Sequence, residues 1–285
     1  MKIPNFILGG IMKSGTTFLH NLLINHPQVK VLKRDMSFSY FDDDRVFKNG
    51  ENWDVNLFSE IKKDLKSNEI VGQTSADCAF NPQSVQRIMD YNPNTKLIFV
   101  LRHPIDRAYS LYWHQYGMGR EHKSFEKAID VEANKIKKSY YNFKNFSYLE
   151  RSKYYQQFQE VKKIVPEANL LILDFESLTK NTLKSINSVL DFLEIDKISD
   201  IEELGYSNLP RNRALIPKYK FMVKLSHFLQ KFGFVSLGRK ALNMTREEVR
   251  PPKMNLETRK QLEQKLAKDI QFYNEVKLNF NKKIN

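Results

Sequence analysis

A lysine among small and hydroxyl-bearing residues near the start of the chain is typical of a phosphate site. The set follows a short apolar run at 6–8 and comprises Lys13, Ser14, Gly15, Thr16 and Thr17. Many α/β proteins hold phosphate with the N–H groups of a loop and a helix N-terminus, and a lysine adds charge. We therefore expect this loop to bind a phosphate-bearing molecule.

The order of residues in the loop departs from that of ATP and GTP sites. A nucleoside-triphosphate loop places its lysine after the last glycine and follows it with a hydroxyl that reaches magnesium. Here Lys13 precedes Gly15 by two positions. The sequence thus indicates a phosphate loop of another kind.

A second pair of polar residues follows a later apolar run. Arg102 comes directly after the strand-like stretch 96–101, and Ser110 lies two turns into the helix expected from Pro104. A forked guanidinium and a hydroxyl together make a good receptor for a terminal phosphate. Arg102 would lie at the carboxyl end of its strand, which is where open α/β sheets bind ligands.

Strands and helices alternate along the part of the chain that carries these residues. Apolar runs predict strands at 4–9, 69–73, 96–101 and 169–174. Helical spacing is clearest at 16–25, 82–90, 151–164 and 256–280. The alternation favours an α/β fold with a central parallel sheet flanked by helices on both faces.

The two motifs together resemble those of sulfotransferases that use 3′-phosphoadenosine 5′-phosphosulfate (PAPS). In that family a Lys-x-Gly-Thr-Thr loop holds the 5′-phosphosulfate, and an Arg followed eight residues later by Ser holds the 3′-phosphate. The resemblance covers most of residues 4–200, and it is nearer to the glycan-type and bacterial branches than to the cytosolic phenol and steroid branch. It implies the P-loop-like sulfotransferase fold, with the 3′-phosphate on Arg102 and Ser110.

The resemblance also implies roles in catalysis. Lys13 would donate to the bridging oxygen of the leaving phosphate, and no divalent metal is expected. In glycan-type relatives a Lys-Glu pair after the first helix supplies the base, and Arg34-Asp35 falls at this place. Asp35 is therefore the candidate base for an acceptor hydroxyl on a carbohydrate or glycolipid, with Asp42 second and His20 third.

Other stretches match the family less closely. Gln73 stands where relatives carry Glu, and Ser75 is expected to border the nucleotide or the acceptor. Tyr154 is either a nucleotide contact or a core aromatic. Arg107 is expected to pair with Asp106 on a helix surface rather than with the 3′-phosphate.

The positive charge is concentrated in the last quarter of the chain. Residues 211–285 hold 18 Lys and Arg against 6 Asp and Glu, a net +12 of the +13 total. This concentration indicates a polyanionic neighbour such as the nucleotide, an acidic acceptor or an anionic membrane surface, and no nucleic acid is expected. The stretch 218–232 fits either an interfacial helix or a packed helix beside the acceptor. Relatives close a basic or glycine-containing loop over the nucleotide here, so the resemblance implies this role for Arg211, Arg213 or Arg250.

Length and composition favour one domain over 1–285. We expect a nucleotide-binding core at about 1–200 and a basic, mostly helical part at about 208–285. The first strand follows Met1 closely, and no run approaches the ~18 apolar residues of a spanning helix. A cytoplasmic protein is expected, with peripheral contact at the inner membrane face as a further expectation. The lone Cys78 excludes an internal disulfide.

Two rival functions stay open. A P-loop kinase would use Asp174, which ends the fourth predicted strand, as its magnesium ligand. An inactive relative would keep only nucleotide or polyanion binding. The loss of the family's Glu at both Asp35 and Gln73 supports the second rival.

Overall fold

The computed structural model describes residues 3–31, 40–42, 44, 47, 61, 63–75, 77–205 and 214–284. It divides into two compact units. The first combines residues 1–102, 154–210 and 271–285, and the second combines 103–153 and 211–270. That all 285 residues form one domain stays a prediction.

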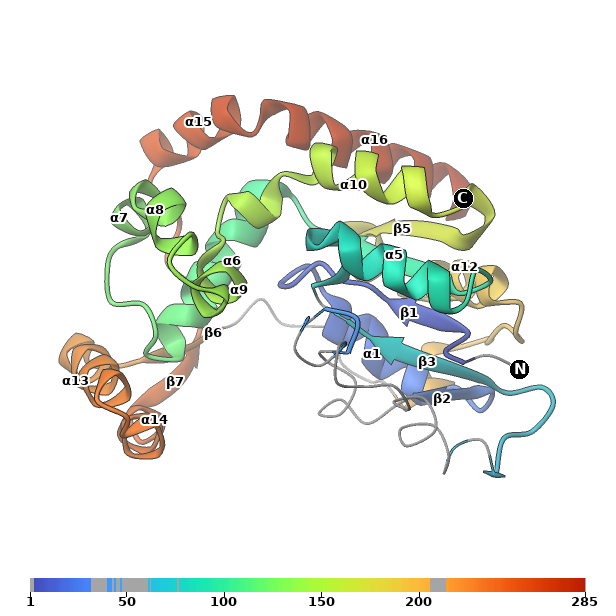
Figure 1. Ribbon diagram of the computed structural model, residues 1–285, viewed down its shortest axis with the longest axis horizontal. Helices are drawn as coiled ribbons and strands as arrows, with labels where there is room; N and C mark the ends of the chain where they lie inside the picture. Colours follow the sequence, from blue (N-terminus) through green and yellow to red (C-terminus); the bar gives the residue numbers. More distant parts are fainter. Residues whose placement is uncertain are drawn as a thin grey trace. The chain divides into compact units, whose positions relative to one another are not determined.

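A five-stranded parallel sheet forms the centre of the first unit (Figure 1). The strand order is β2-β3-β1-β4-β5, and every pairing in it is parallel. The strands are β1 (Phe6–Leu8), β2 (Val29–Val31), β3 (Ile70–Thr74), β4 (Lys96–Leu101) and β5 (Leu170–Asp174). All five carboxyl ends therefore meet at one edge of the sheet.

Helices cover both faces of the sheet, because successive side chains of each strand point to opposite sides. Phe6 and Leu8 pack in one apolar cluster with α1 and α12, whereas Ile7 packs in another with α5 and α10. The helices of this unit are α1 (Thr16–Ile24), α5 (Pro82–Tyr91), α10 (Tyr154–Ile164), α11 (Phe175–Lys180), α12 (Thr182–Leu193) and, from residue 271, α16 (Ala267–Ile284). The expected three-layer α/β fold is confirmed.

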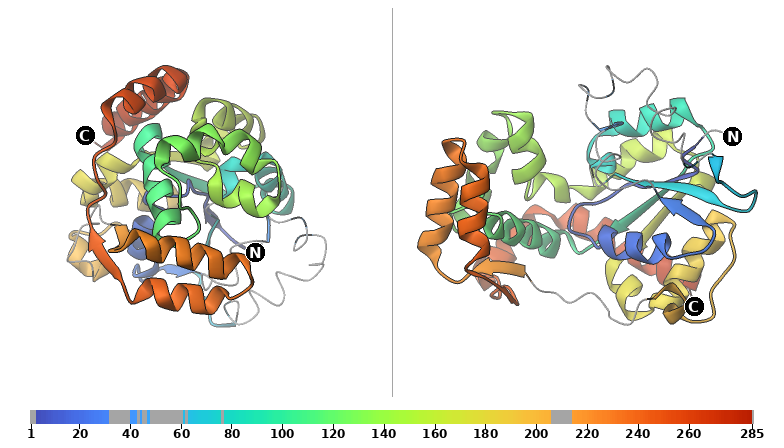
Figure 2. Two further views of the ribbon diagram at one scale, coloured as in Figure 1. Left: turned by 90° about the vertical axis from the view of Figure 1, so that its left-hand side faces the viewer. Right: turned by 90° about the horizontal axis from the view of Figure 1, so that it is seen from below.

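The second unit is mostly helical (Figure 2). Its helices are α6 (Pro104–Gly117), α7 (Phe125–Asp130), α8 (Glu132–Ile136), α9 (Tyr140–Phe146), α13 (Lys220–Lys231), α14 (Val235–Asn243) and α15 (Leu256–Lys265). A two-stranded antiparallel sheet joins β6 (Ala214–Pro217) to β7 (Arg246–Val249). Short 3-10 turns occur at Cys78–Phe80, Glu150–Ser152, Glu167–Asn169 and Ile201–Leu204.

Two predicted helices differ from the structure. The helix expected at 151–164 begins at Tyr154, because Glu150–Ser152 forms a 3-10 turn before it. The single helix expected at 256–280 is two helices, α15 and α16, which break at Leu266. Leu266 is buried and has φ −110°, outside the helical range. Neither Gly nor Pro marks this break in the sequence.

Candidate functional site

The loop after β1 is fixed by backbone hydrogen bonds to the neighbouring strand. The Gly9 N–H donates to the Ile98 carbonyl at 2.8 Å, and the Ile11 N–H donates to the Val100 carbonyl at 3.2 Å. The Gly10 carbonyl accepts from the Val100 N–H at 2.9 Å. The loop therefore leaves the sheet edge at a defined place, just before Lys13.

The loop itself has the backbone of an anion cradle. Lys13 has φ 71° and Gly15, which precedes α1, has φ 98°, so both lie in the left-handed region. A non-glycine residue in that region is uncommon and often marks a functional site. The N–H groups of the first turn of α1 have no intrahelical acceptor, and the positive end of the helix dipole lies there. The arrangement can bind an anion.

Two further features suit a bound anion at this loop. Ser14 is fully buried, and its hydroxyl has no hydrogen-bond partner among the residues that the structure describes. A Cβ on Gly15 would lie 2.4 Å from the Phe175 ring, so only glycine fits. Backbone can approach a ligand closely at such a position.

Phe175 links this loop to Arg102. The ring lies against Gly15, and the Arg102 guanidinium carbon is 5.4 Å from the ring centroid. The Arg102 carbonyl accepts a hydrogen bond from the buried Tyr154 hydroxyl at 2.9 Å. Tyr154 thus acts as a core aromatic that positions Arg102. The phosphate loop and Arg102 follow neighbouring strands, β1 and β4.

Polar side chains also gather where β3 ends, on the other side of β1. The Ser75 hydroxyl donates to the Asp42 carboxylate, which is only 4% exposed. The Ser75 N–H donates to the Leu8 carbonyl at 2.9 Å, so this pair lies beside the end of β1. His20 contacts the Thr74 hydroxyl through Nδ1 at 2.9 Å.

Six more residues were predicted to belong to the site. Four of them lie outside the described residues: Asp35, Arg34, Arg211 and Arg213. Gln73 lies on β3 and is 1% exposed. Arg250 is exposed and belongs to the second unit, so its approach to the nucleotide stays a prediction.

Asp174 is already committed to structural contacts. Its Oδ2 caps α11 by accepting from the Ser177 N–H at 2.7 Å and the Ser177 hydroxyl at 2.6 Å. Its Oδ1 accepts from the Tyr273 hydroxyl at 2.5 Å. Burial, and to a lesser extent the Asp174 carboxylate, raises the pKa of Tyr273. Both oxygens therefore have donors, and this does not fit the magnesium ligand that a kinase would need.

Ser110 lies on α6, in the second unit, whereas Arg102 ends a segment of the first. That the two share a 3′-phosphate stays a prediction.

The prediction that Arg107 pairs with Asp106 on a helix surface was wrong. Arg107 is fully buried and donates to the Ser152 hydroxyl at 2.7 Å and to the Tyr148 carbonyl. Asp106 pairs instead with Arg259 at 2.8 Å.

Sequence reasoning missed Phe175 altogether and ranked Asp42 second. Phe175 directly follows β5, and the rule that ligands bind at the carboxyl ends of strands could have drawn attention to it. No local signal indicated that Asp42 meets Ser75, because the two are 33 residues apart.

Among the described residues, no group of three or more His, Cys, Asp and Glu is arranged to hold a metal. None of the described helices combines the length and apolar character that crossing a bilayer requires.

Comparisons with known proteins identify the family of this chain. The family model of the sulfotransferase domain matches residues 4–234. The membrane-associated sulfotransferase kil1 of Dictyostelium discoideum is 33% identical over 140 residues, which is 47% of this chain and 29% of that protein. Mouse heparan sulfate glucosamine 3-O-sulfotransferase 5 is 26% identical over 68% of this chain and 54% of its own length.

Solved structures resemble most of this chain. A sulfotransferase from Alicyclobacillus acidocaldarius is 21% identical and has a TM-score of 0.59, with 86% of this chain and 96% of that chain covered. At this identity the likeness shows the fold alone. The chain spans about half of the mouse enzyme and less than a third of the Dictyostelium protein. Because the family model covers most of the sequence, the chain belongs to the sulfotransferase domain family.

Proposed function

We propose that this chain transfers a sulfuryl group from PAPS to an acceptor hydroxyl. The observation that carries the proposal is the cradle after β1, where Lys13 and Gly15 have left-handed backbone and Phe175 leaves no room for a side chain at position 15. Such a loop presents N–H donors to an anion. Family membership supplies the chemical class of that anion.

In the proposed reaction the acceptor oxygen forms a bond to sulfur while the bond from sulfur to the 5′-phosphate oxygen breaks. The electron pair of the broken bond stays on the phosphate, where the Lys13 ammonium and the N–H groups of Ser14 to Thr17 meet its charge. The products are the sulfated acceptor and 3′-phosphoadenosine 5′-phosphate (PAP). By analogy with phosphoryl transfer, positioning and electrostatics supply most of the catalysis. No divalent metal is proposed, because these donors can meet the charge of a nucleotide monophosphate.

The proton of the acceptor hydroxyl passes to a carboxylate. Asp35 is the candidate that the family resemblance supports, and Asp42 is the candidate that the contact with Ser75 beside β1 supports. Asp35→Asn and Asp42→Asn separate them. Loss of the base should lower kcat by about 10²–10⁴-fold and leave PAP affinity unchanged.

The 3′-phosphate is assigned to Arg102 and Ser110. The acceptor is proposed to be a carbohydrate or glycolipid, since the mouse relative is named for a heparan sulfate glucosamine. A cytoplasmic location and contact of the basic C-terminal part with the inner membrane face also remain proposals.

Calorimetric titration tests the nucleotide class. The chain should bind PAP with micromolar affinity without metal, and it should bind ADP, which lacks the 3′-phosphate, far more weakly. Preference for ATP with magnesium would overturn the proposal. An inactive relative is the second candidate, because Gln73 replaces a glutamate of the family. PAP binding without transfer from PAPS to any of a panel of hydroxyl acceptors would favour it.

A further inference from the structure

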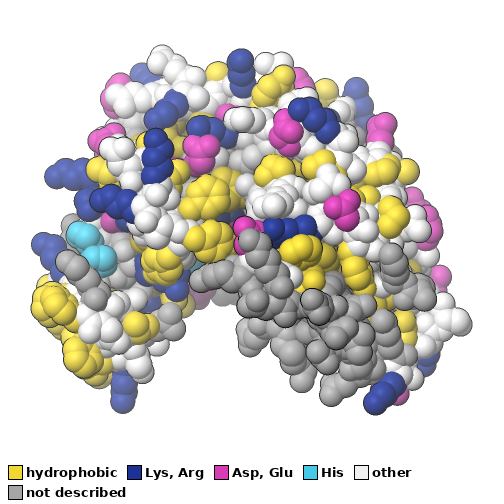
Figure 3. Space-filling model, viewed as in Figure 1, with side chains coloured by type: hydrophobic (Ala, Val, Ile, Leu, Met, Phe, Trp, Pro, Cys, Tyr) yellow, Lys and Arg dark blue, Asp and Glu magenta, His cyan; other side chains and the backbone are white. Residues whose placement is uncertain are grey.

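Two helices of the second unit form a hairpin that the proposed reaction does not use. We define the basic hairpin as residues 218–246, which contain α13 and α14 between β6 and β7. Figure 2 shows the two helices side by side in orange. Figure 3 shows hydrophobic side chains gathered over the part of the second unit where Figure 1 draws α13 and α14.

The solvent-facing side of α13 is apolar. Phe221, Leu225, Phe228 and Phe232 recur at helical spacing and are 63%, 42%, 57% and 61% exposed. The opposite side of the helix holds the buried residues, among them Val223. A helix with a core-facing apolar side normally exposes polar residues on the other. Here the exposed side is apolar as well.

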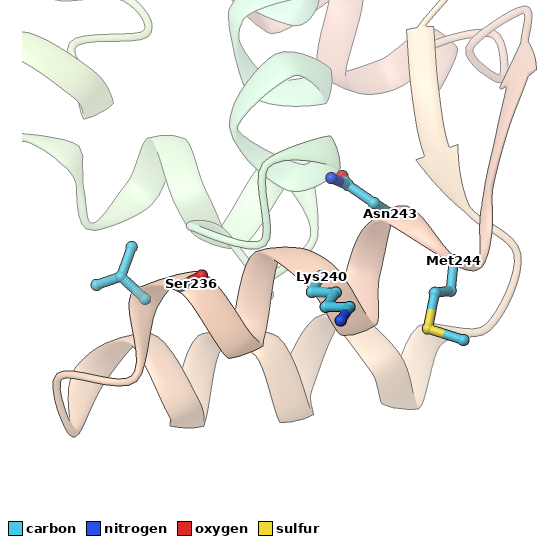
Figure 4. A pocket seen from close by; sticks show the side chains of 5 residues that line it. Ser236, Lys240, Asn243 and Met244 are labelled. Carbon is cyan, nitrogen blue, oxygen red and sulfur yellow. The ribbon is translucent and has the colours of Figure 1, made fainter.

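The exposed apolar surface continues through the turn and along α14. Its members are Phe234, Val235, Leu237 and Met244, and Met244 is 81% exposed. A hollow of about 790 Å³ lies on α14 (Figure 4) and is lined by Val235, Ser236, Lys240, Asn243 and Met244. Large contiguous exposed apolar surface usually marks an interaction site.

The charge of the basic hairpin has one sign. Residues 214–246 contain seven Lys and Arg and neither Asp nor Glu. Lys224 is exposed beside Leu225 in the middle of the apolar side of α13, and Lys240 lines the hollow on α14. On each helix an exposed lysine therefore lies beside exposed apolar side chains.

Hydrogen bonds and close packing hold the two helices of the hairpin against each other, and one hydrogen bond joins the hairpin to Met118. The Gln230 amide nitrogen donates to the Ser226 hydroxyl at 2.9 Å and to the Met118 carbonyl at 3.3 Å. A Cβ on Gly238 would lie 2.9 Å from the Ser226 carbonyl oxygen, so α13 and α14 approach closely. Because the two helices are packed, the outward position of the phenylalanines is a feature of the fold.

We infer that the basic hairpin is a docking surface for an anionic lipid bilayer. A bilayer interface offers both an apolar layer for the phenylalanines and anionic headgroups for the lysines. A soluble polyanion would satisfy only the lysines. A second copy of the chain would bring Lys224 and Lys240 against the same cations, and no carboxylate of either hairpin is available to pair with them, which disfavours pairing through this face. The inference narrows the membrane contact proposed above to this hairpin, and it does not depend on the proposed sulfotransfer.

Flotation of the full chain with lipid vesicles tests the inference. The chain should float with vesicles of equimolar phosphatidylcholine and phosphatidylglycerol, but not with phosphatidylcholine alone. Phe228→Glu with Phe232→Glu should lower the partition coefficient at least about tenfold, because two exposed apolar anchors become charged. Lys224→Glu with Lys240→Glu should also lower it about tenfold or more, and added salt should weaken binding of the wild type.

Matched variants on other surfaces serve as controls. Leu256→Glu with Leu278→Glu alters two exposed apolar residues elsewhere, and Lys265→Glu with Lys268→Glu alters two exposed lysines elsewhere. Both should float like the wild type. Failure of the wild type to bind anionic vesicles would overturn the inference. So would unchanged binding by the phenylalanine variant, or a dimer in light scattering that the same variant dissociates.

Discussion

The phosphate loop and the basic hairpin both present lysines, yet they are built in different ways. Lys13 lies on left-handed backbone that hydrogen bonds to β4 hold in place, and Phe175 packs against the next glycine. Lys224 lies on a regular helix among exposed phenylalanines. The backbone around Lys13 is therefore suited to one small anion, whereas the side chains around Lys224 form a broad surface.

Removing Arg102 should have the largest effect on the nucleotide. Arg102→Ala is expected to weaken PAP binding by about 2–5 kcal/mol, because a phosphate would lose a desolvated charged partner. Calorimetry measures this loss. Arg102→Lys should restore part of it, since a lysine keeps the charge without the fork. Equal PAP affinity in wild type and Arg102→Ala would remove this residue from the site.

Substitutions of Lys13 and Lys224 test the difference between the loop and the basic hairpin directly. Lys13→Ala should lower kcat on the order of 10²-fold or more, because the leaving phosphate loses its charged donor. Lys224→Ala should leave kcat on a soluble acceptor unchanged. The two variants are compared in the same assay of sulfuryl transfer from PAPS. A similar loss of kcat in both variants would mean that the hairpin also contributes to sulfuryl transfer.

A methyl group on Gly15 should disturb the cradle. Gly15→Ala is expected to lower the free energy of unfolding by about 1–3 kcal/mol and to weaken PAP binding, because its Cβ would meet the Phe175 ring. Gly205→Ala is the matched control, since Gly205 also has positive φ but nothing within 4 Å of an added Cβ. Urea unfolding of both variants separates backbone strain from the clash. If the two variants lose equal stability, Phe175 does not crowd position 15.

The smallest expected effect concerns a histidine pair in the second unit. The ring centroids of His122 and His227 are 4.4 Å apart. Desolvation, with lesser effects of nearby cations, lowers the pKa of each histidine below 6.5. The unfolded chain then binds more protons just below pH 6.5, so stability should fall as the pH falls through this range. Urea unfolding above and below pH 6.5 measures the slope. His122→Gln should reduce it, and an unchanged slope would contradict the shift.

The sheet and the turn from strand to helix at 6–17 were predictable because their signals are local. The buried run 96–101 matches β4 residue for residue, and the small residues of the loop adjoin the strand that positions them. The pairing of Asp42 with Ser75 was not predictable, because the fold brings together residues that no local pattern connects. Arg107 shows the same limit. A charged residue beside Asp106 suggested a surface pair, but the buried side of α6 takes its guanidinium inward, to Ser152 and the Tyr148 carbonyl.

The contacts of α16 with the β5–α11 corner have a consequence for synthesis of the chain. Tyr273 donates to Asp174, Lys277 pairs with Glu176 at 2.8 Å, and the Asn281 side-chain amide lies 2.7 Å from the Ser177 hydroxyl. The next residue after Asp174 is Phe175, which packs against Gly15. The phosphate loop leaves the ribosome first, but the corner that supports it gains these partners only once α16 has emerged. A nascent chain halted before α16 would therefore carry the loop at 9–15 without its complete support.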